Sequence, residues 1–326
     1  MRLVASPLIN DEDATSSGAF DLLPLSDIVP HMVLSAKSQA ILFVALSSAC
    51  SSIATVFKVA AVRDIDPFHA ALWGVLFASV VLFCIVRIRG EALSFARLRT
   101  VWKPLLGLVI TRPVIGNILF TLGMAHSTGI KAMMLTKMEP YVVLLWVWLI
   151  DRKNPKSSDL GLLALHVCGA ILLSVGTQFE LGAAQWGDIL IGGAVLSAAL
   201  SYRFVPKVTA ELGSLQTNAW VELLGGLVIL PFVLYFVPFT LDESQYQGWL
   251  FMVIHVLLFN VVALSLWYAS LKNLEHWLSS ALRALGPLVA APFAWYFFNE
   301  RVDIVQGLGA VLVLGTSVLL VRAKRS

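Results

Sequence analysis

Apolar residues fill runs of about 20 residues along almost the whole chain, separated by short stretches rich in charge, glycine or proline. A run of this length is what an α-helix needs to cross a bilayer. The pattern predicts ten spanning helices, at 39–61, 68–87, 104–124, 128–150, 159–176, 186–206, 218–238, 248–270, 277–298 and 303–322. It therefore predicts an all-α polytopic membrane protein, with nine or eleven spans as alternatives because the third and fourth runs merge near 123–129.

Composition supports a lipid environment. Of the 326 residues, 58% are hydrophobic and only 13% are charged, against roughly 25% charged in soluble domains. So few charges could not cover a soluble protein of this size. Residues 1–38 differ, because they carry Asp11, Glu12 and Asp13 among serines and prolines, and they predict a disordered acidic cytoplasmic tail. This tail lacks the basic and apolar regions of a signal peptide.

The lysines and arginines of the predicted loops favour one orientation. With the N-terminus inside the cell, the inner segments hold 16 of these residues and the outer segments hold three. Cationic loops stay on the cytoplasmic side of a membrane. The asymmetry predicts that both termini are cytoplasmic, which requires an even number of spans. We expect the protein in the plasma (inner) membrane.

The two halves of the chain repeat one pattern of a proline, a charged turn and a glycine-rich helix. The series are Pro140, Asp151, Gly161 and Gly169 in the first half, and Pro287, Glu300, Gly307 and Gly315 in the second. The proline precedes its two glycines by 21 and 29 residues in the first half and by 20 and 28 in the second. Five predicted helices per half is an odd number, so the halves must face opposite ways across the bilayer. Inverted repeats are typical of secondary transporters, and we expect the glycines to allow close helix packing.

These segments resemble the EamA family of the drug/metabolite transporter superfamily. The second-half segments are Trp267-Tyr268-Ala269-Ser270, Gly286-Pro287, Asn299-Glu300-Arg301, Gln306-Gly307 and Gly315, and the first-half residues are Ala125, Pro140, Asp151, Gly161 and Gly169. The resemblance implies two five-helix repeats, over 39–176 and 186–322, in inverted topology around a central cavity that the fourth and ninth helices line. Asp151 and Arg152 depart from the family pattern, because a Glu is usual after the fourth helix.

Charged side chains within the predicted helices are the main candidates for function, because each costs roughly 2.5–3.5 kcal/mol to place in a bilayer. Counted along the helical rise, Arg112, Lys137 and Glu139 fall near the midplane and Arg283 lies within about 6 Å of it. Lys137 and Glu139 are two residues apart, about 200° around a helix, so we expect only one of them to face the cavity.

Three prolines within the predicted helices mark broken helices or hinges. A proline removes the hydrogen bond to the carbonyl four residues earlier. The freed carbonyls belong to Thr136 before Pro140, to Arg283 before Pro287, and to the residue four before Pro113. A freed carbonyl persists in a membrane only where protein, water or ligand satisfies it. Each proline shares a helix face with the residue whose carbonyl it frees, and we expect these faces to line the cavity.

The two arginines favour an anion-handling site. Arg112 and Arg283 would hold a carboxylate or phosphate, since a guanidinium group suits bidentate capture. Glu139 would balance the local charge or serve as a protonation site, and Lys137 is a further candidate. In the alternative, these charges form an interhelical ion pair, for instance Glu139 with Arg112, that fixes packing and contacts no solute.

Four further side chains are site candidates that also have structural alternatives. Asn117 and Asn260 can form hydrogen bonds across helices or to a solute. Trp267 and Tyr268 come near the inner end of the eighth predicted helix. They belong either to the aromatic belt at the membrane surface or to the lining of the cavity.

The repeat, the prolines and the buried charges together predict a secondary carrier that works by alternating access. We expect an exporter or exchanger of a small anionic or zwitterionic metabolite such as an amino or organic acid. Proton-coupled efflux of hydrophobic cations through Glu139 is the alternative. No helix carries paired aspartates or an HExxH motif, so an enzyme is not expected, and the sequence predicts no cofactor and no metal. The expected partners are the solute and the lipid bilayer but no nucleic acid, with proton coupling and a homodimer left open.

Overall fold

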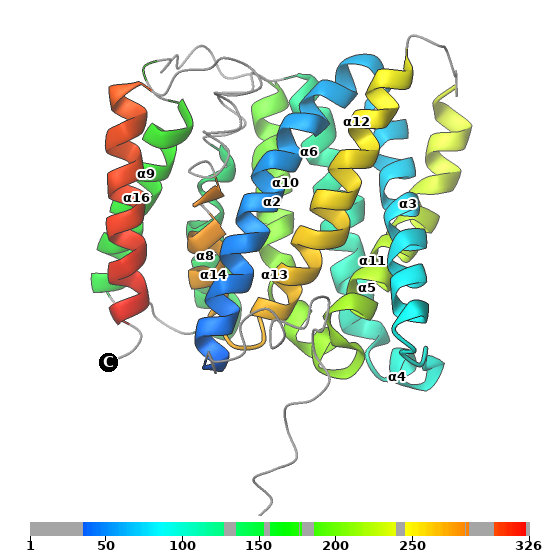
Figure 1. The fold of residues 1–326 in the computed structure, drawn as a ribbon, viewed down its shortest axis with the longest axis horizontal. Helices are drawn as coiled ribbons and strands as arrows, with labels where there is room; N and C mark the ends of the chain where they lie inside the picture. Colours follow the sequence, from blue (N-terminus) through cyan, green and yellow to red (C-terminus); the bar gives the residue numbers. More distant parts are fainter. Residues whose placement is uncertain are drawn as a thin grey trace, which may run out of the picture. The chain divides into compact units, whose positions relative to one another are not determined.

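The computed structural model describes residues 35–126, 135–152, 157–175, 177, 186–238, 245–283, 285–286 and 303–323. Regular structure in these ranges is entirely helical (Figure 1). The elements are α2 (Ala36–Asp64), α3 (Pro67–Ile88), α4 (Phe95–Thr100), α5 (Trp102–Val109), η1 (Ile110–Gly116), α6 (Asn117–Ala125), α8 (Glu139–Asp151), α9 (Ser157–Val175), α10 (Trp186–Ser201), α11 (Val205–Phe236), α12 (Tyr246–Val256), η3 (Leu257–Ala263), α13 (Leu264–Ser270), α14 (His276–Arg283) and α16 (Ile304–Ala323). The all-α class is therefore confirmed, with η1 and η3 as π-helical segments.

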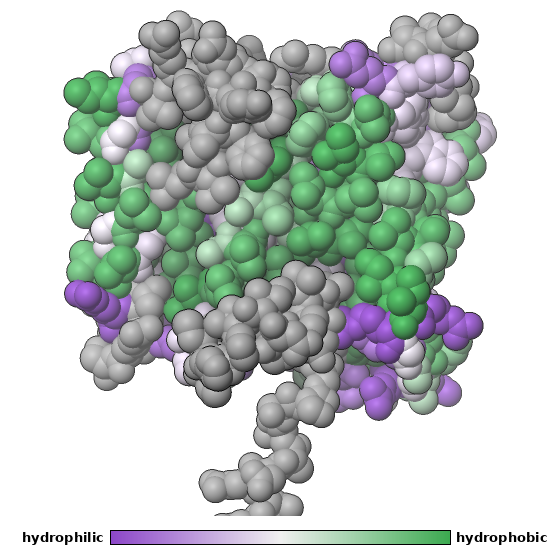
Figure 2. Space-filling view, viewed as in Figure 1, coloured by the Kyte–Doolittle hydropathy of each residue, from purple (hydrophilic) through white to green (hydrophobic). Residues whose placement is uncertain are grey.

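Five helices are long and apolar enough to cross a membrane by length and composition: Ala36–Val62, Pro67–Ile88, Trp102–Gly123, Val205–Phe236 and Tyr246–Ser270. Three shorter apolar helices cover Leu160–Leu173, Trp186–Ser201 and Ile304–Leu320. Figure 2 shows hydrophobic side chains across the middle of the described helices and hydrophilic ones toward their ends. Such exposed apolar surface suits lipid and not water. The chain is an integral membrane protein, and the count of ten spans stays a prediction.

The boundary between α10 and α11 differs from the prediction. The sequence predicts helices over 186–206 and 218–238, whereas α10 ends at Ser201 and α11 begins at Val205. Gly213 interrupts α11 with φ 77°, a left-handed conformation that glycine adopts without steric cost. A short helical stretch therefore precedes Gly213, and the membrane-length part of α11 follows it.

Side-chain caps fix where several helices begin. Asp66 accepts hydrogen bonds from the N–H groups of the first turn of α3, and Pro67 occupies the first helical position. Asp303 and Gln306 cap each other before α16, with N–H to side-chain distances of 2.8 and 3.0 Å. Asp303 Oδ2 also accepts bonds from the N–H and hydroxyl of Thr177 at 2.6 and 2.8 Å. The backbone bonds from Gln306 and Thr177 hold the pKa of Asp303 below its ordinary value, because they stabilise its charged form.

Helices α9 and α16 pack closely through two glycines. A Cβ added at Gly309 would overlap the backbone nitrogen of Leu173, and one at Gly169 would lie 2.7 Å from Leu312 Cβ. The other repeat glycines have open space, with no described atom within 4 Å of an added Cβ: Gly161, Gly307 and Gly315. The packing expectation for the repeat glycines therefore holds for Gly169 and is wrong for the other three.

The two halves pack against each other in similar ways. Helix α2, the first helix of the first half, contacts α12, η3, α13 and α14 of the second half. Helix α10, the first helix of the second half, contacts η1, α6 and α8 of the first half. Each half also carries one seven-residue π-helical segment in its third helix. π-Helical turns are rare in proteins, and those that occur are often found at functional sites. The side chains around η1 and η3 are therefore candidates for a functional site.

Candidate functional site

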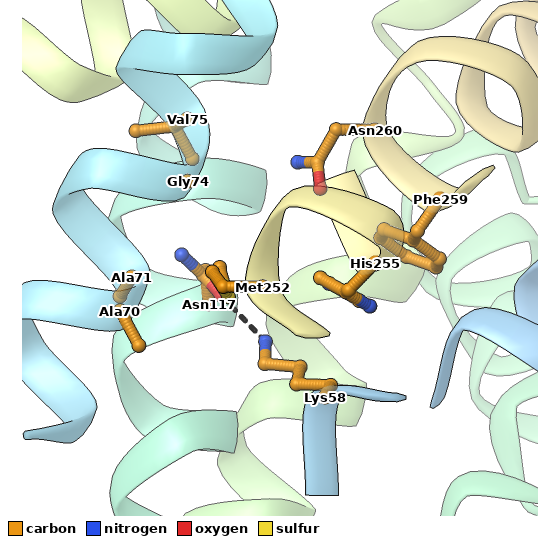
Figure 3. A pocket seen from close by; sticks show the side chains of 10 residues that line it. All are labelled: Lys58, Ala70, Ala71, Gly74, Val75, Asn117, Met252, His255, Phe259 and Asn260. Carbon is orange, nitrogen blue, oxygen red and sulfur yellow. Dashed lines mark hydrogen bonds between the residues drawn. The ribbon is translucent and has the colours of Figure 1, made fainter. Parts of the chain in front are cut away.

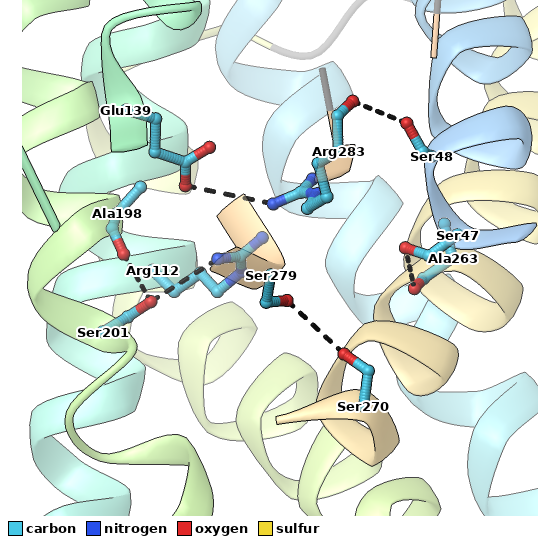
Figure 4. Close-up of polar contacts among 10 residues, drawn as sticks. All are labelled: Ser47, Ser48, Arg112, Glu139, Ala198, Ser201, Ala263, Ser270, Ser279 and Arg283. Atoms are coloured by element: carbon cyan, nitrogen blue, oxygen red, sulfur yellow. Dashed lines mark hydrogen bonds and ion pairs between the residues drawn. The ribbon is translucent and has the colours of Figure 1, made fainter. Parts of the chain in front are cut away.

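Four side chains from four helical elements meet inside the described helices, and we call them the arginine cluster: Arg112 of η1, Glu139 of α8, Trp267 of α13 and Arg283 of α14. Arg283 Nη1 lies 3.9 Å from Glu139 Oε1 (Figure 4). The Cζ atoms of Arg112 and Arg283 lie 4.1 and 5.4 Å from the centroid of the Trp267 ring. A guanidinium group over an indole face is attracted by the ring quadrupole. Trp267 therefore holds both arginines close together.

The arginine cluster has a surplus of positive charge. Its two guanidinium groups face a single carboxylate, and Lys137 lies within electrostatic reach of both Arg283 and Glu139. Among the described residues Arg112 makes no ion pair, and its Nη1 donates a long hydrogen bond of 3.5 Å to Ser201 Oγ. The ion pair suggested between Glu139 and Arg112 is wrong, because Glu139 pairs with Arg283 instead.

The start of α8 corrects two sequence expectations. The sequence predicts a continuous helix over 128–150, but Lys137 and Met138 form a turn and α8 begins at Glu139. Pro140 is the second residue of α8, where its missing N–H breaks no helical bond. Pro140 therefore helps to begin a helix, and does not break one at Thr136. Because Lys137 lies outside α8, helical spacing does not set its direction relative to Glu139, and Lys137 is within electrostatic reach of Arg283 and Glu139.

A π-helical segment carries Arg112. The N–H of Asn117 donates to the carbonyl of Arg112, five residues earlier, and Pro113 lies inside the segment. The wider turn accommodates a proline, which has no N–H to donate. Gly225 of α11 packs on the proline ring, because a Cβ there would lie 2.5 Å from Pro113 Cγ. The predicted hinge at Pro113 is thus a locally widened helix that stays continuous.

The carbonyl of Arg283 needs a hydrogen-bond donor from another helix, because Pro287 has no N–H to donate to it. Pro287 itself lies outside the described residues, but Ser48 Oγ of α2 donates a 2.5 Å hydrogen bond to Arg283 O (Figure 4). Gly286 packs on the same helix, because a Cβ there would lie 2.9 Å from the Ser48 carbonyl. Helix α2 therefore supports the end of α14 at the point where the helical bond is lost.

Trp267 and Tyr268 are both fully buried, at 0% exposure, which excludes a place in an aromatic belt at the membrane surface. The Tyr202 ring packs edge-on against Trp267 with ring centroids 4.8 Å apart. Within the described residues, Trp267 Nε1 and Tyr268 Oη have no hydrogen-bond partner. Buried polar groups without partners are rare and call for an explanation, and both of these can donate a hydrogen bond.

A second polar region surrounds a small cavity whose polar lining consists of Lys58, Asn117, His255 and Asn260 (Figure 3). Lys58 Nζ donates to Asn117 Oδ1 at 3.3 Å. The cavity of about 20 Å³ has room for roughly one water molecule and none for an organic solute. The predicted candidates Asn117 and Asn260 therefore line a cavity that is too small for an organic solute, and neither belongs to the arginine cluster.

Glu222 of α11 is a buried acid that the sequence does not place in the site. It is 3% exposed, and its Oε1 accepts a 3.1 Å hydrogen bond from Asn260 Nδ2. Asn218, one turn earlier and also buried, donates to the Asn260 carbonyl at 2.5 Å and to Ser265 Oγ at 3.0 Å. The predicted start of the seventh helix at 218 puts both residues near the membrane surface. The break at Gly213 shows that the membrane-length part of α11 begins earlier than predicted, so both residues lie further inside the helix.

Hydroxyl groups from opposite halves satisfy carbonyls in the two π-helical segments. Ser197 Oγ of α10 donates to Thr111 O in η1 at 2.7 Å, and Ser47 Oγ of α2 donates to Ala263 O in η3 at 2.7 Å. In each case the first helix of one half bonds to the third helix of the other. We call these two bonds the serine clamps.

Long apolar helices that enclose buried charges, in two halves with similar packing, define a polytopic transport protein of the membrane. The family model of the EamA-like transporter family matches residues 38–175 and again 185–322. The chain belongs to this family, as the sequence resemblance predicts.

The names of similar proteins call them transporters and state no substrate. It is 28% identical over 204 residues to "Uncharacterized transporter YetK" from Bacillus subtilis, a match that covers 59% of this chain and 60% of that protein. It is 25% identical over 276 residues to an "Uncharacterized transporter" from Archaeoglobus fulgidus, covering 83% of this chain and 92% of that one. A solved chain titled "Crystal structure of protein" superposes with a TM-score of 0.73 at 13% identity, over 89% of this chain and 100% of that chain. At this identity the likeness shows the fold alone.

Proposed function

We propose that the protein is a secondary carrier for a small anionic or zwitterionic metabolite, such as an amino or organic acid, and that the arginine cluster binds its acidic group. One observation carries the proposal: Arg112 and Arg283 meet on Trp267, with Glu139 as the single carboxylate in ion-pair range among the described residues. Transport by alternating access would use two inverted five-helix repeats, over 39–176 and 186–322, ten spans and cytoplasmic termini.

The length of the Arg283–Glu139 ion pair suits a replacement of Glu139 by a solute carboxylate. Charge-assisted hydrogen bonds to a guanidinium group are about 2.7–2.9 Å long, whereas the Arg283–Glu139 pair is 3.9 Å long. The unpartnered donors Trp267 Nε1 and Tyr268 Oη lie on the neighbouring positions of α13. A bound carboxylate supplies the acceptor oxygens that these donors lack. Lys137 and Thr136, just before α8, would contribute at the edge of the same site.

The alternative substrate class, hydrophobic cations, fits the cluster less well. A cation carrier needs a carboxylate that is free to meet the substrate. Here Glu139 lies next to Arg283, with Arg112 and Lys137 nearby. A lipophilic cation would therefore meet net repulsion in a region of low dielectric constant, where like charges are costly.

The test is solute binding to purified protein in detergent, read as a shift of the thermal unfolding midpoint. The panel contains amino acids, organic acids, sugar phosphates and lipophilic cations. A ligand that binds only the folded state raises the midpoint by mass action. We expect acids to stabilise the wild type and to lose this effect in Arg112→Ala and Arg283→Ala. Arg89→Ala is the matched control, because it also removes an arginine from an ion pair, with Glu91 at 3.5 Å, outside the cluster.

Either of two results would contradict the proposal. The first is stabilisation by acids that survives in both cluster variants. The second is stabilisation by lipophilic cations that is lost in Glu139→Gln and kept in Arg283→Ala. Transport in proteoliposomes then checks the substrate found by binding, with Arg283→Ala expected to insert and fold but to carry no solute.

A further inference from the structure

Two buried oxygen atoms on one face of α11 have no hydrogen-bond donor in the part of the chain that the structure describes. Glu222 Oε1 accepts from Asn260, but Glu222 Oε2 has no partner among the described residues. Asn218, four residues earlier on the same helix, has its Oδ1 without a partner as well. The amide of Asn218 is oriented correctly, because its Nδ2 donates to the Asn260 carbonyl, an atom that can only accept. Residues at i and i+4 lie one above the other on a helix.

No cation neutralises Glu222 at contact distance in the described structure. The two cations with an electrostatic effect on it are Arg112 of η1 and Lys58 of α2, and each has its hydrogen bond elsewhere. Arg112 bonds to Ser201 (Figure 4), and Lys58 bonds to Asn117 (Figure 3). Arg112 also stacks on Trp267. A buried carboxylate without a paired charge carries a large desolvation cost.

Protonation of Glu222 would explain both the oxygen atoms without a donor and the buried carboxylate without a paired cation. A protonated carboxyl group is neutral and gains one O–H donor. Asn218 Oδ1, one turn earlier on the same helix face, is an acceptor that lacks a donor among the described residues. We propose that Glu222 is a proton-binding site of this carrier, separate from the arginine cluster, with Asn218 and Asn260 holding its neutral form. A sodium ion would need several more oxygen ligands than these two free acceptors.

The further inference that the proton is coupled to the solute rests on the proposed anion site. Arg112 is the shared element, because it stacks in the arginine cluster and also acts on Glu222. When Glu222 is ionised, it competes with a solute anion for the charge of Arg112. When Glu222 is protonated, it no longer competes, and the charge of Arg112 interacts with the solute anion only. Proton binding and anion binding therefore strengthen each other, and by linkage the effect is reciprocal.

Other titratable groups also surround α11. Tyr268 of α13 is the nearby phenol that interacts with Glu222, and His255 of α12 lies on the cavity beside Lys58. Helices α3, α4 and α5 also pack against α11. Their titratable side chains stand mostly near the helix ends: His69, Arg87, Arg97, Arg99 and Lys103, with the thiol of Cys84 one turn from the end of α3. Glu222 is therefore the acid expected to titrate inside this region.

The first test is infrared spectroscopy of the purified protein as a function of pH, without any solute. The carbonyl stretch of a protonated carboxyl group is separate from the bands of a carboxylate. We expect such a band at neutral pH in the wild type, its loss in Glu222→Gln, and its retention in Glu211→Gln. Glu211 is the matched control, an exposed acid on the same helix. A band that survives in Glu222→Gln, or stabilisation by sodium that is lost in Glu222→Gln, would overturn the proposal.

The second test measures anion affinity across pH. In the wild type we expect affinity to fall about 10-fold as Glu222 ionises, within the roughly 5- to 150-fold range of coupled sites. Because a glutamine resembles the neutral acid, Glu222→Gln should keep the high affinity at every pH. Equal pH dependence in both proteins would refute the coupling. If the Glu222-dependent band is present and no anion binds at any pH, the proton site stands and the proposed substrate class fails.

Discussion

The ion pair between Glu139 and Arg283 can be separated from solute binding by a double-mutant cycle. At 3.9 Å two unit charges attract by about 4 kcal/mol at an effective dielectric constant of about 20. Loss of hydration offsets most of this gain, and the side chains are 16% and 18% exposed. We therefore expect a coupling energy of about 1 kcal/mol, at the upper end of the range for exposed pairs. Arg283→Ala should cost about 2 kcal/mol of unfolding free energy, and part of this loss should be recovered by adding Glu139→Ala.

The assay measures unfolding free energy in mixed detergent and anion binding for the wild type, both single variants and the double variant. Removing Glu139 takes away the internal competitor, so Glu139→Ala should bind the acid at least as tightly as the wild type. Arg283→Ala should lose the acid whether or not Glu139 is present. Two results together would refute a binding role for Arg283. They are a coupling energy above about 3 kcal/mol, the range of tightly buried pairs, and unchanged anion binding in Arg283→Ala. The ion pair would then be a structural link between helices.

Three other predictions address the fold. Gly309→Ala should destabilise the protein by about 1–3 kcal/mol, because the new Cβ meets the backbone of α9, whereas Gly315→Ala, in open space, should be neutral or stabilising; thermal midpoints of the two variants decide. Ser47→Ala and Ser197→Ala should each cost about 1 kcal/mol, because each removes one hydrogen bond between the halves. Equal thermal midpoints for the wild type and the variants would contradict this. The hydrogen bonds of Asp303 lower its pKa in the folded state. Their contribution to the free energy of unfolding is therefore fully present above the ordinary pKa of 3.8 and is lost as the pH falls through the lower pKa of the folded state. Asp303→Asn should abolish this dependence of stability on acid pH.

The members of the arginine cluster can be predicted from sequence, but their arrangement cannot. A charge in a membrane helix is costly wherever its helix packs, so Arg112, Glu139 and Arg283 are identifiable from the apolar runs around them. Which of these charges pair depends on contacts between helices far apart in the chain. The sequence suggests Glu139 with Arg112, whereas the structure pairs Glu139 with Arg283 and brings the arginines together through Trp267.

Errors in the helix boundaries explain the site residues that the sequence misses. Hydropathy counts apolar residues and is nearly blind to a single backbone angle. The positive φ of Gly213 therefore goes unnoticed, although it decides that Glu222 lies well inside α11. In the same way, the turn at Lys137 is hidden within an apolar run. A helical wheel assumes one unbroken helix, so it cannot place Lys137 relative to Glu139 across this turn.

The two π-helical segments connect the proposed anion and proton sites to the contacts between the halves. Segment η1 carries Arg112 and is bonded by Ser197 of the second half. Segment η3 carries Asn260, which holds Glu222, and its last carbonyl is bonded by Ser47 of the first half. A π-helical turn has a shifted set of backbone hydrogen bonds, so a small change in its winding rotates the side chain that it bears. Because each serine clamp crosses between the halves, any movement of one half against the other must strain η1 and η3 or release their clamps. On the proposals made above, an anion bound at Arg112 and a proton bound at Glu222 would therefore bias the same movement.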